Sequence, residues 1–156
     1  GVGSRIVESV IEVNAPQKAR MIKKIRSALG GNEAGKTIGV LGLTFKPETD
    51  DMRDSPALSI LPPMMEKGAK VRAHDPQGME EARDMLPAEV DYCDDLYAVC
   101  NDADVLVVLT EWNAYRGLDL ARVKAAMRGN VFVDLRNIYE RKTLEPLGFE
   151  YPCVGH

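Results

Sequence analysis

One short run of residues limits the folds open to this chain more than any other feature. Residues 105–109 (Val-Leu-Val-Val-Leu) are apolar at five successive positions, between Asp104 and Thr110. A strand that is apolar on both faces has to be covered on both faces, which is typical of parallel sheets in α/β proteins. The run therefore predicts a fully buried strand in an α/β domain.

The rest of the chain alternates between strand and helix patterns. Strands are predicted near residues 37–43, 69–74, 90–93, 104–110 and 131–134, with residues 149–154 as a further edge strand. Helices are predicted near residues 56–67, 78–86, 95–101, 112–116 and 119–127. Such alternation implies right-handed crossovers and a Rossmann-like, doubly wound, mostly parallel sheet.

A long amphipathic helix is expected ahead of the sheet. Residues 5–29 carry apolar side chains close to helical spacing, and Gly30-Gly31 supplies a stop signal. A continuous helix of this length would span roughly 37 Å, which suggests a connector or an interface with a second chain. Pro16 is expected to kink or divide it. We therefore expect a connecting and dimerisation helix over residues 1–31, and a sheet domain over residues 36–156.

Composition narrows the classes of function. The net charge of −4 over 156 residues argues against nucleic acid as a main partner. No apolar run approaches the roughly 18 residues of a membrane span. The three cysteines, Cys93, Cys100 and Cys153, sit at no metal or redox spacing, so idle thiols in a reducing cytoplasm are expected.

Two glycine patterns imitate nucleotide-binding motifs. Residues 30–37 (Gly-Gly-Asn-Glu-Ala-Gly-Lys-Thr) match the P-loop pattern, but the motif needs a strand before the loop and a helix after it, and here that order is inverted. Gly39 and Gly42 lack the third glycine of a dinucleotide fingerprint. Asp75-Pro76 is then interpreted as a strand-ending turn, and the domain as a Rossmann topology that has lost its own dinucleotide site.

The candidate site lies where the predicted strands end. Residues 42–56 form a long, charged connection after the first strand, and open α/β sheets bind ligands at this edge. The strand ends contribute Phe45, Lys46, Arg53, Asp75, Thr110, Glu111, Trp112, Asp134, Arg136 and Asn137. The cations among them are suited to an anionic ligand.

Other roles for these residues remain open. Lys46 and Arg53 either bind an anion or pair with the acidic residues of their own loop, and Arg136 is either a ligand residue or part of a structural ion pair. His74 is expected to be structural, and Trp112 is expected to pack a helix onto the sheet. No nucleophile triad, metal cluster or carboxylate pair is apparent, so no catalytic residue and no metal ligand is assigned.

Several segments together resemble one family. Residues 42–56 (Gly-Leu-Thr-Phe-Lys-Pro-Glu-Thr-Asp-Asp-Met-Arg-Asp-Ser-Pro) closely resemble the signature loop of the C-terminal domain of UDP-glucose/GDP-mannose dehydrogenases. Residues 71–76, 103–112 and 133–137 fit the same family in order and spacing, and residues 5–29 resemble its central, dimer-forming helix. The loop is most similar to that of the members acting on UDP-glucose.

The resemblance implies a role for particular residues. It implies the oxidation of a UDP-sugar at C6 to a carboxylate, with reduction of two NAD⁺. Phe45, Lys46 and Arg136 match residues that contact the substrate, and Arg53 matches an arginine that reaches NAD bound on the other domain.

The chain also departs from the family pattern. The family's Gly-Gly-x-Cys-x-Pro-Lys-Asp motif and its NAD-binding glycine turn are missing from the sequence. We therefore expect a C-terminal fragment that is inactive alone and a cofactor bound mainly elsewhere. The alternatives are a non-catalytic nucleotide-binding or dimerisation module, a free-standing nucleotide-binding α/β domain, and a relative acting on UDP-N-acetylhexosamine or GDP-mannose.

Overall fold

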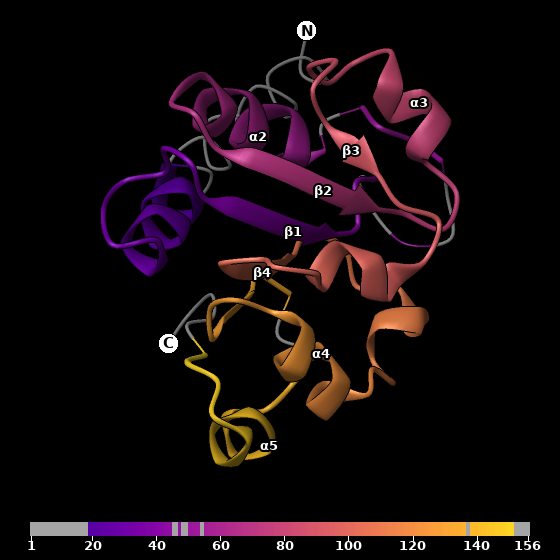
Figure 1. Cartoon of the computed structure of the whole chain (residues 1–156). Coiled ribbons are helices and arrows are strands. Elements are labelled where there is room, and N and C mark those ends of the chain that lie inside the picture. Colours follow the sequence, from indigo (N-terminus) through magenta and orange to yellow (C-terminus); the bar gives the residue numbers. More distant parts are fainter. Residues whose placement is uncertain (1–18, 45–46, 48–49, 54, 137, 152–156) are drawn as a thin grey trace, which may run out of the picture.

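The computed structural model describes residues 19–44, 47, 50–53, 55–136 and 138–151 (Figure 1). A sheet of five strands, all parallel, lies at the centre, in the order β3-β2-β1-β4-β5. The strands are β1 (Thr37–Leu41), β2 (Lys70–His74), β3 (Asp91–Tyr92), β4 (Val105–Val108) and β5 (Val131–Asp134). The predicted Rossmann-like, doubly wound class is confirmed, with β1 in the middle.

Helices cover both faces of this sheet (Figure 1). The α-helices after β1 are α2 (Pro56–Glu66), α3 (Met79–Arg83), α4 (Leu120–Ala126) and α5 (Arg141–Leu144), and residues 19–28 are helical as well. Short 3₁₀ helices are η1 (Leu96–Cys100), η2 (Asn113–Tyr115) and η3 (Glu145–Leu147). Ser55 caps α2 as expected, since its hydroxyl accepts the amide of Ala57 at 3.2 Å.

Some boundaries differ from the predicted ones. The helix expected over 78–86 ends at Arg83, with Asp84 as its C-cap. The segments near 95–101 and 112–116 are 3₁₀ rather than α-helices. The edge strand predicted for 149–154 is wrong in its described part, where Glu150 makes one isolated bridge to Val131.

The side chains of β4 divide between two apolar layers. Val105 and Val107 pack with Ile25, α2 and the start of β2, whereas Leu106 and Val108 pack on the other face with Tyr115 and the C-terminal aromatics. All four residues of β4 are buried. The alternation explains why this strand is apolar at every position.

The glycines of residues 30–37 end a helix and lead into β1, as the inverted order of the P-loop pattern predicts. Gly30, Gly31 and Gly35 have φ of 79°, 87° and 73°. The amide of Gly31 donates to Arg26 O at 2.9 Å, and Arg26 pairs with Glu33 at 2.7 Å. These contacts end the helical segment and hold it against the linker that leads into β1.

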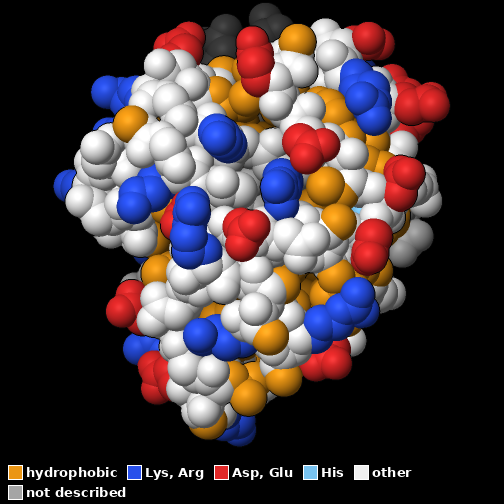
Figure 2. Space-filling view, viewed as in Figure 1, with side chains coloured by type: hydrophobic (Ala, Val, Ile, Leu, Met, Phe, Trp, Pro, Cys, Tyr) orange, Lys and Arg blue, Asp and Glu red, His pale blue; other side chains and the backbone are white. Residues whose placement is uncertain are grey.

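Charged side chains of both signs are interspersed on the face shown in Figure 2. Within the described residues, no helix is long and apolar enough to cross a membrane.

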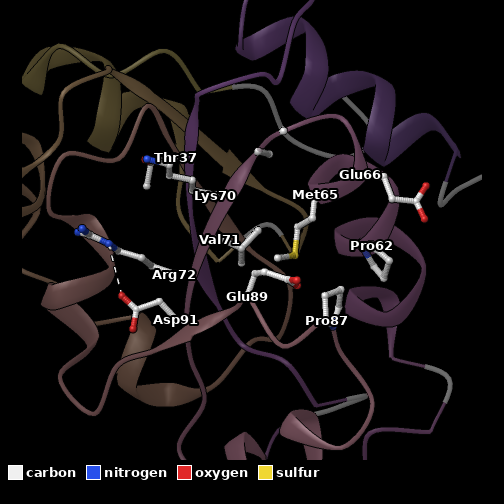
Figure 3. Close-up of a pocket in the computed structure, with 12 residues that line it drawn as sticks. Thr37, Pro62, Met65, Glu66, Lys70, Val71, Arg72, Pro87, Glu89 and Asp91 are labelled. Carbon is white, nitrogen blue, oxygen red and sulfur yellow. Dashed lines mark ion pairs between the residues drawn. The ribbon is translucent and has the colours of Figure 1, made fainter.

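The amino edge of the sheet carries a groove of about 650 Å³ beside the start of β2 (Figure 3). Val71, Met65 and Pro87 form part of its lining, and the pair Arg72–Asp91 lies at 3.8 Å. This edge lies opposite the one where ligands bind in open α/β sheets, so the groove is not the candidate site.

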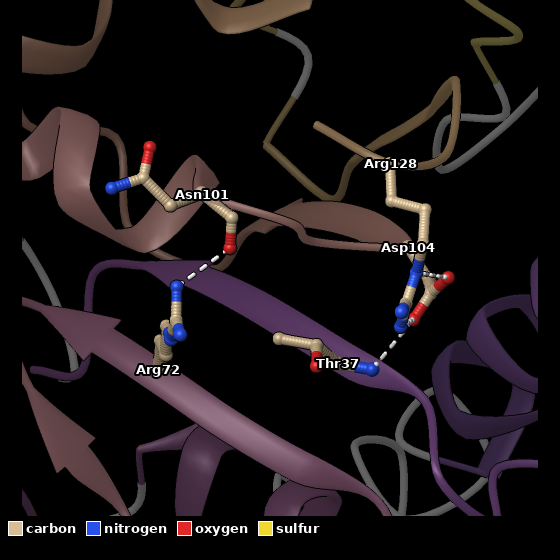
Figure 4. A network of polar contacts seen from close by, with 5 residues as sticks. All are labelled: Thr37, Arg72, Asn101, Asp104 and Arg128. Carbon is tan, nitrogen blue, oxygen red and sulfur yellow. Dashed lines mark hydrogen bonds and ion pairs between the residues drawn. The ribbon is translucent and has the colours of Figure 1, made fainter. Parts of the chain in front are cut away.

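Polar contacts also fasten the starts of the strands (Figure 4). The carboxylate of Asp104 accepts the amide of Thr37 at 2.8 Å and two guanidinium donors of Arg128, at 3.0 and 2.7 Å. The hydrogen bond from Arg128, with that from Thr37, holds the pKa of Asp104 below its usual value. The starts of β1 and β4 are therefore held together by contacts within the fold.

Candidate functional site

The candidate site is the carboxyl edge of the sheet between β1 and β4. From β1 the chain crosses to β2 and β3 on one side, while β4 and β5 lie on the other. The chain therefore leaves the ends of β1 and β4 toward opposite sides of the sheet. This topological switch point is where doubly wound sheets bind ligands.

The loops that leave β1 and β4 are locked to each other. Gly42 has a φ of 95°, and a Cβ at this position would lie 2.5 Å from the Cβ of Thr110. The hydroxyl of Thr110 donates to Thr44 O at 2.7 Å, and the amide of Leu109 donates to Leu41 O at 2.9 Å. Only glycine fits at position 42, because any side chain would push the two loops apart.

Asp75 fastens the loop after β1 from the other side. Its Oδ2 accepts the amides of Leu43 and Thr44, at 2.8 and 3.0 Å, and the hydroxyl of Thr44 at 3.1 Å. Its Oδ1 accepts the amides of Gln77 and Gly78, at 2.9 and 2.7 Å. The interpretation of Asp75-Pro76 as a strand-ending turn is confirmed.

The contacts of Asp75 also explain how the loop after β1 differs from a dinucleotide-binding loop. In a Rossmann domain the amides after the first strand face a pyrophosphate. Here the amides of Leu43 and Thr44 face a carboxylate of the same chain, and Asp75 is fully buried. These residues therefore do not fit a dinucleotide on the usual side of β1.

Arg136 crosses from the end of β5 to the end of β4. Its Nε lies 2.9 Å from Leu109 O and 3.1 Å from the Glu111 carboxylate, and its own amide donates to Asp134 Oδ1 at 3.0 Å. Arg136 and Glu111 are both half-buried. The arginine therefore has a structural ion pair, one of the two roles predicted for it, and it lies beside the switch point.

Arg53 and Arg136 do not share a contact among the described residues. Arg53 is exposed and lies against its own loop, with Nε at 3.1 Å from Asp51 Oδ1. It lines a separate groove of about 440 Å³ with Asp50, Glu81 and Met85. Phe45, Lys46 and Asn137 lie outside the described residues.

His74 and Tyr115 form a buried pair at the end of β2. The Tyr115 hydroxyl donates to His74 O at 3.0 Å and lies 2.9 Å from His74 Nδ1. Since that hydroxyl has one proton, Nδ1 is the protonated nitrogen of the ring and donates to the tyrosine. Burial lowers the pKa of His74, against the nearby carboxylates of Asp75, Asp95 and Asp94. The expected structural histidine is confirmed, and Trp112 is buried in the same apolar layer as Tyr115.

Glu111 and Asp134, which contact Arg136, were among the residues predicted at the strand ends, whereas Tyr139 and Tyr151, which contact Asp134, were missed. Glu111 was visible as a charged residue directly after a buried strand, and β4 pairs with β5 so that Val108 lies opposite Asp134. Tyr139 and Tyr151 gave no signal of this kind. Their contacts to Asp134 depend on how the chain returns to β5 after Asp134.

The chain matches, over residues 39–141, the family described as "UDP-glucose/GDP-mannose dehydrogenase family, UDP binding domain". It is 45% identical over 151 residues to a UDP-glucose 6-dehydrogenase of Rhizobium meliloti, with 97% of this chain and 34% of that protein covered. The chain thus spans about a third of the length of the curated relatives it matches.

Solved structures agree with this assignment. A UDP-glucose dehydrogenase from Pyrobaculum islandicum superimposes with a TM-score of 0.76 at 34% identity, covering 93% of this chain and 31% of that one. An NDP-N-acetyl-D-galactosaminuronic acid dehydrogenase from Methanosarcina mazei gives a TM-score of 0.75 at 28% identity, with 90% of this chain and 29% of that one covered.

Proposed function

The chain belongs to the UDP-glucose/GDP-mannose dehydrogenase family, and from this membership we propose that it is the substrate-binding part of an NAD-dependent UDP-glucose 6-dehydrogenase. The nucleotide sugar is held at the carboxyl edge of the sheet, beside the switch point. The overall reaction converts the C6 hydroxyl of UDP-glucose to a carboxylate with reduction of two NAD⁺.

The observation that carries the proposal is the place of Arg136. A guanidinium beside the switch point, oriented through its Nε by Leu109 and Glu111, is suited to an anionic ligand such as a diphosphate. In the proposal Arg136, Phe45 and Lys46 contact the nucleotide sugar. Arg53 contributes to the binding of NAD. NAD is bound mainly by another domain, because the amides after β1 are occupied by Asp75.

Calorimetric titration tests the proposal. UDP-glucose, UDP and GDP-mannose are titrated into the wild type, Lys46→Ala and Arg136→Met. Losing one charge-assisted contact is expected to weaken UDP-glucose binding about ten- to a hundredfold, the equivalent of roughly 1.5–3 kcal/mol. Arg116→Met, which removes an exposed arginine directly after η2, is the control. Equal binding by all four proteins contradicts the assigned roles.

A second substrate class has support from one comparison. The Methanosarcina mazei structure is that of an enzyme named for an N-acetylated sugar. UDP-N-acetylgalactosamine therefore belongs in the same titration, and tighter binding than that of UDP-glucose would favour this class. No NADH is expected from the purified chain with either sugar, because the cysteine motif is missing from the sequence.

The remaining partners are proposed on similar grounds. We propose a homodimer through the N-terminal helix, a cytoplasmic location, and neither nucleic acid nor membrane as a partner, in keeping with the net charge of −4 and the free thiols of Cys93 and Cys100. Ile25 is fully buried in the chain's own core, so association is better tested at the half-buried Ile22. Sedimentation equilibrium of wild type and Ile22→Lys is expected to show a dimer that the variant weakens.

A further inference from the structure

The turn after β5 is fastened through the carboxylate of Asp134, which is fully buried. Its Oδ1 accepts the amide of Arg136 at 3.0 Å, and its Oδ2 accepts the amide of Tyr139 at 3.0 Å. One side chain thereby fixes the backbone on both sides of the turn that presents Arg136.

The hydroxyl of Tyr151 reaches this turn from the C-terminal segment. It lies 2.5 Å from both Asp134 Oδ2 and Tyr139 O. The segment itself is held beside β5, because the amide of Phe132 donates to Glu150 O and that of Glu150 donates to Asn130 O, each at 2.8 Å.

The ring of Tyr151 is packed independently of its hydroxyl. It is buried, and it contacts the ring of Phe132 with centroids 6.0 Å apart. Phe132 also stacks edge-on against Phe149 and Tyr139. A phenylalanine at position 151 keeps this packing and loses the polar contact to the turn.

The contact between Tyr151 and Asp134 bears on Arg136 because two hydrogen bonds hold this arginine, one at its amide and one at its Nε. Its amide depends on Asp134 Oδ1, and its Nε depends on Leu109 O. If the Asp134 carboxylate rotates, its Oδ1 no longer accepts the amide of Arg136. The backbone of Arg136 then moves relative to β4, and the hydrogen bond from Arg136 Nε to Leu109 O lengthens. The hydroxyl of Tyr151 is thus linked, through Asp134 and the amide of Arg136, to a guanidinium at the switch point.

We propose that Tyr151 is a positioning residue for Arg136, acting through Asp134. The expected effect of Tyr151 on ligand binding rests on the proposed function. Its expected effect on the position of Arg136 does not depend on a ligand. Two measurements on the same variants separate these parts.

The first measurement needs no ligand. In ¹H–¹⁵N spectra the Nε–H of Arg136 is assigned by its loss in Arg136→Met, and its exchange with water is followed. Tyr151→Phe is expected to speed that exchange by about tenfold, the effect of weakening one hydrogen bond by a typical amount. Tyr97→Phe is the matched control, since its hydroxyl accepts the amide of Asp119, which is not part of the turn after β5. Unchanged exchange in Tyr151→Phe overturns the proposal, because a purely structural tyrosine would lower the melting temperature alone.

The second measurement is a double-mutant cycle with UDP-glucose. Tyr151→Phe is expected to weaken binding about three- to tenfold in the wild type and by less than about twofold in Arg136→Met, since the arginine through which it acts is then gone. Equal weakening in both backgrounds overturns the proposal. Should Tyr151→Phe fail to fold, Asp134→Asn takes its place with the same expectations. Absence of UDP-glucose binding by the wild type contradicts the proposed function, and the exchange measurement still decides the role of Tyr151.

Discussion

Thr44 donates both its amide and its hydroxyl to one oxygen of Asp75, at 3.0 and 3.1 Å. The same carboxylate also accepts three other amides, so a single side chain organises the loop after β1 and the turn after β2. The negative charge that a Rossmann loop would take from a ligand is supplied here by the protein.

Asp75→Asn is expected to lower the free energy of unfolding by about 1.5–3 kcal/mol, because an amide group would set donors against the donors that now surround the carboxylate. Urea unfolding at neutral pH measures the change. Asp84→Asn, at an exposed site, is the matched control and is expected to change stability by less than about 0.5 kcal/mol. Equal effects of the two substitutions would contradict the role assigned to Asp75.

Gly42→Ala is expected to destabilise the domain on the order of 2–4 kcal/mol. The backbone there has a φ of 95°, and the new Cβ would lie 2.5 Å from the Cβ of Thr110, so strain and overpacking add. Gly117→Ala is the control, since a Cβ at Gly117 meets nothing within 4 Å. Thermal unfolding compares them, and a similar melting temperature for both would show that the loops after β1 and β4 separate easily.

The pair formed by Asp104 and Arg128 is expected to stabilise the fold at neutral pH and to lose that effect in acid. The pKa of Asp104 is lowered, chiefly by the hydrogen bond from Arg128, so this stabilisation is complete above the unfolded-state pKa of about 3.9 and disappears as pH falls through the folded-state pKa. Wild type and Arg128→Met are compared by urea unfolding from pH 7 to pH 3. Their difference should shrink below about pH 4. A constant difference would rule out the carboxylate as its origin.

His74 is expected to give stability the same direction of pH dependence in a higher range. Burial lowers its pKa, so the folded state resists protonation, and stability is lost as pH falls below the unfolded-state pKa of about 6.5. The slope of unfolding free energy against pH between about pH 7 and pH 5 should be steeper in wild type than in His74→Gln. Parallel slopes would mean that His74 takes up its proton without cost to the fold.

Much of the fold was predictable because it depends on local patterns. The five apolar residues 105–109 and the Ser55-Pro56 start of α2 are signals within a few residues of chain, and both are confirmed. β3 has only two residues, and its pairing with Arg72 and Ala73 is set by the sheet rather than by its own sequence. Its limits could therefore not be predicted closely.

The site was predictable only in part, for the same reason. That Arg136 follows a buried strand is a local fact, and its place at the carboxyl edge follows from parallel strands. Its contacts with Leu109 and Glu111 join residues about 25 positions apart, and Tyr151 meets Asp134 from 17 positions away. Such pairings depend on strand order and on the path of the C-terminal segment, and neither can be predicted from the spacing of residues along the sequence.

The central place of β1 affects how the chain emerges during synthesis. β1 pairs with β2 on one side, but its other edge pairs with β4, and the amide of Thr37 bonds to a residue 67 positions later. At roughly 5–20 residues per second, the ribosome needs about 3–13 s to add those residues. During that interval an apolar strand has one edge unsatisfied, which makes it a target for chaperones and for wrong pairing with other nascent chains.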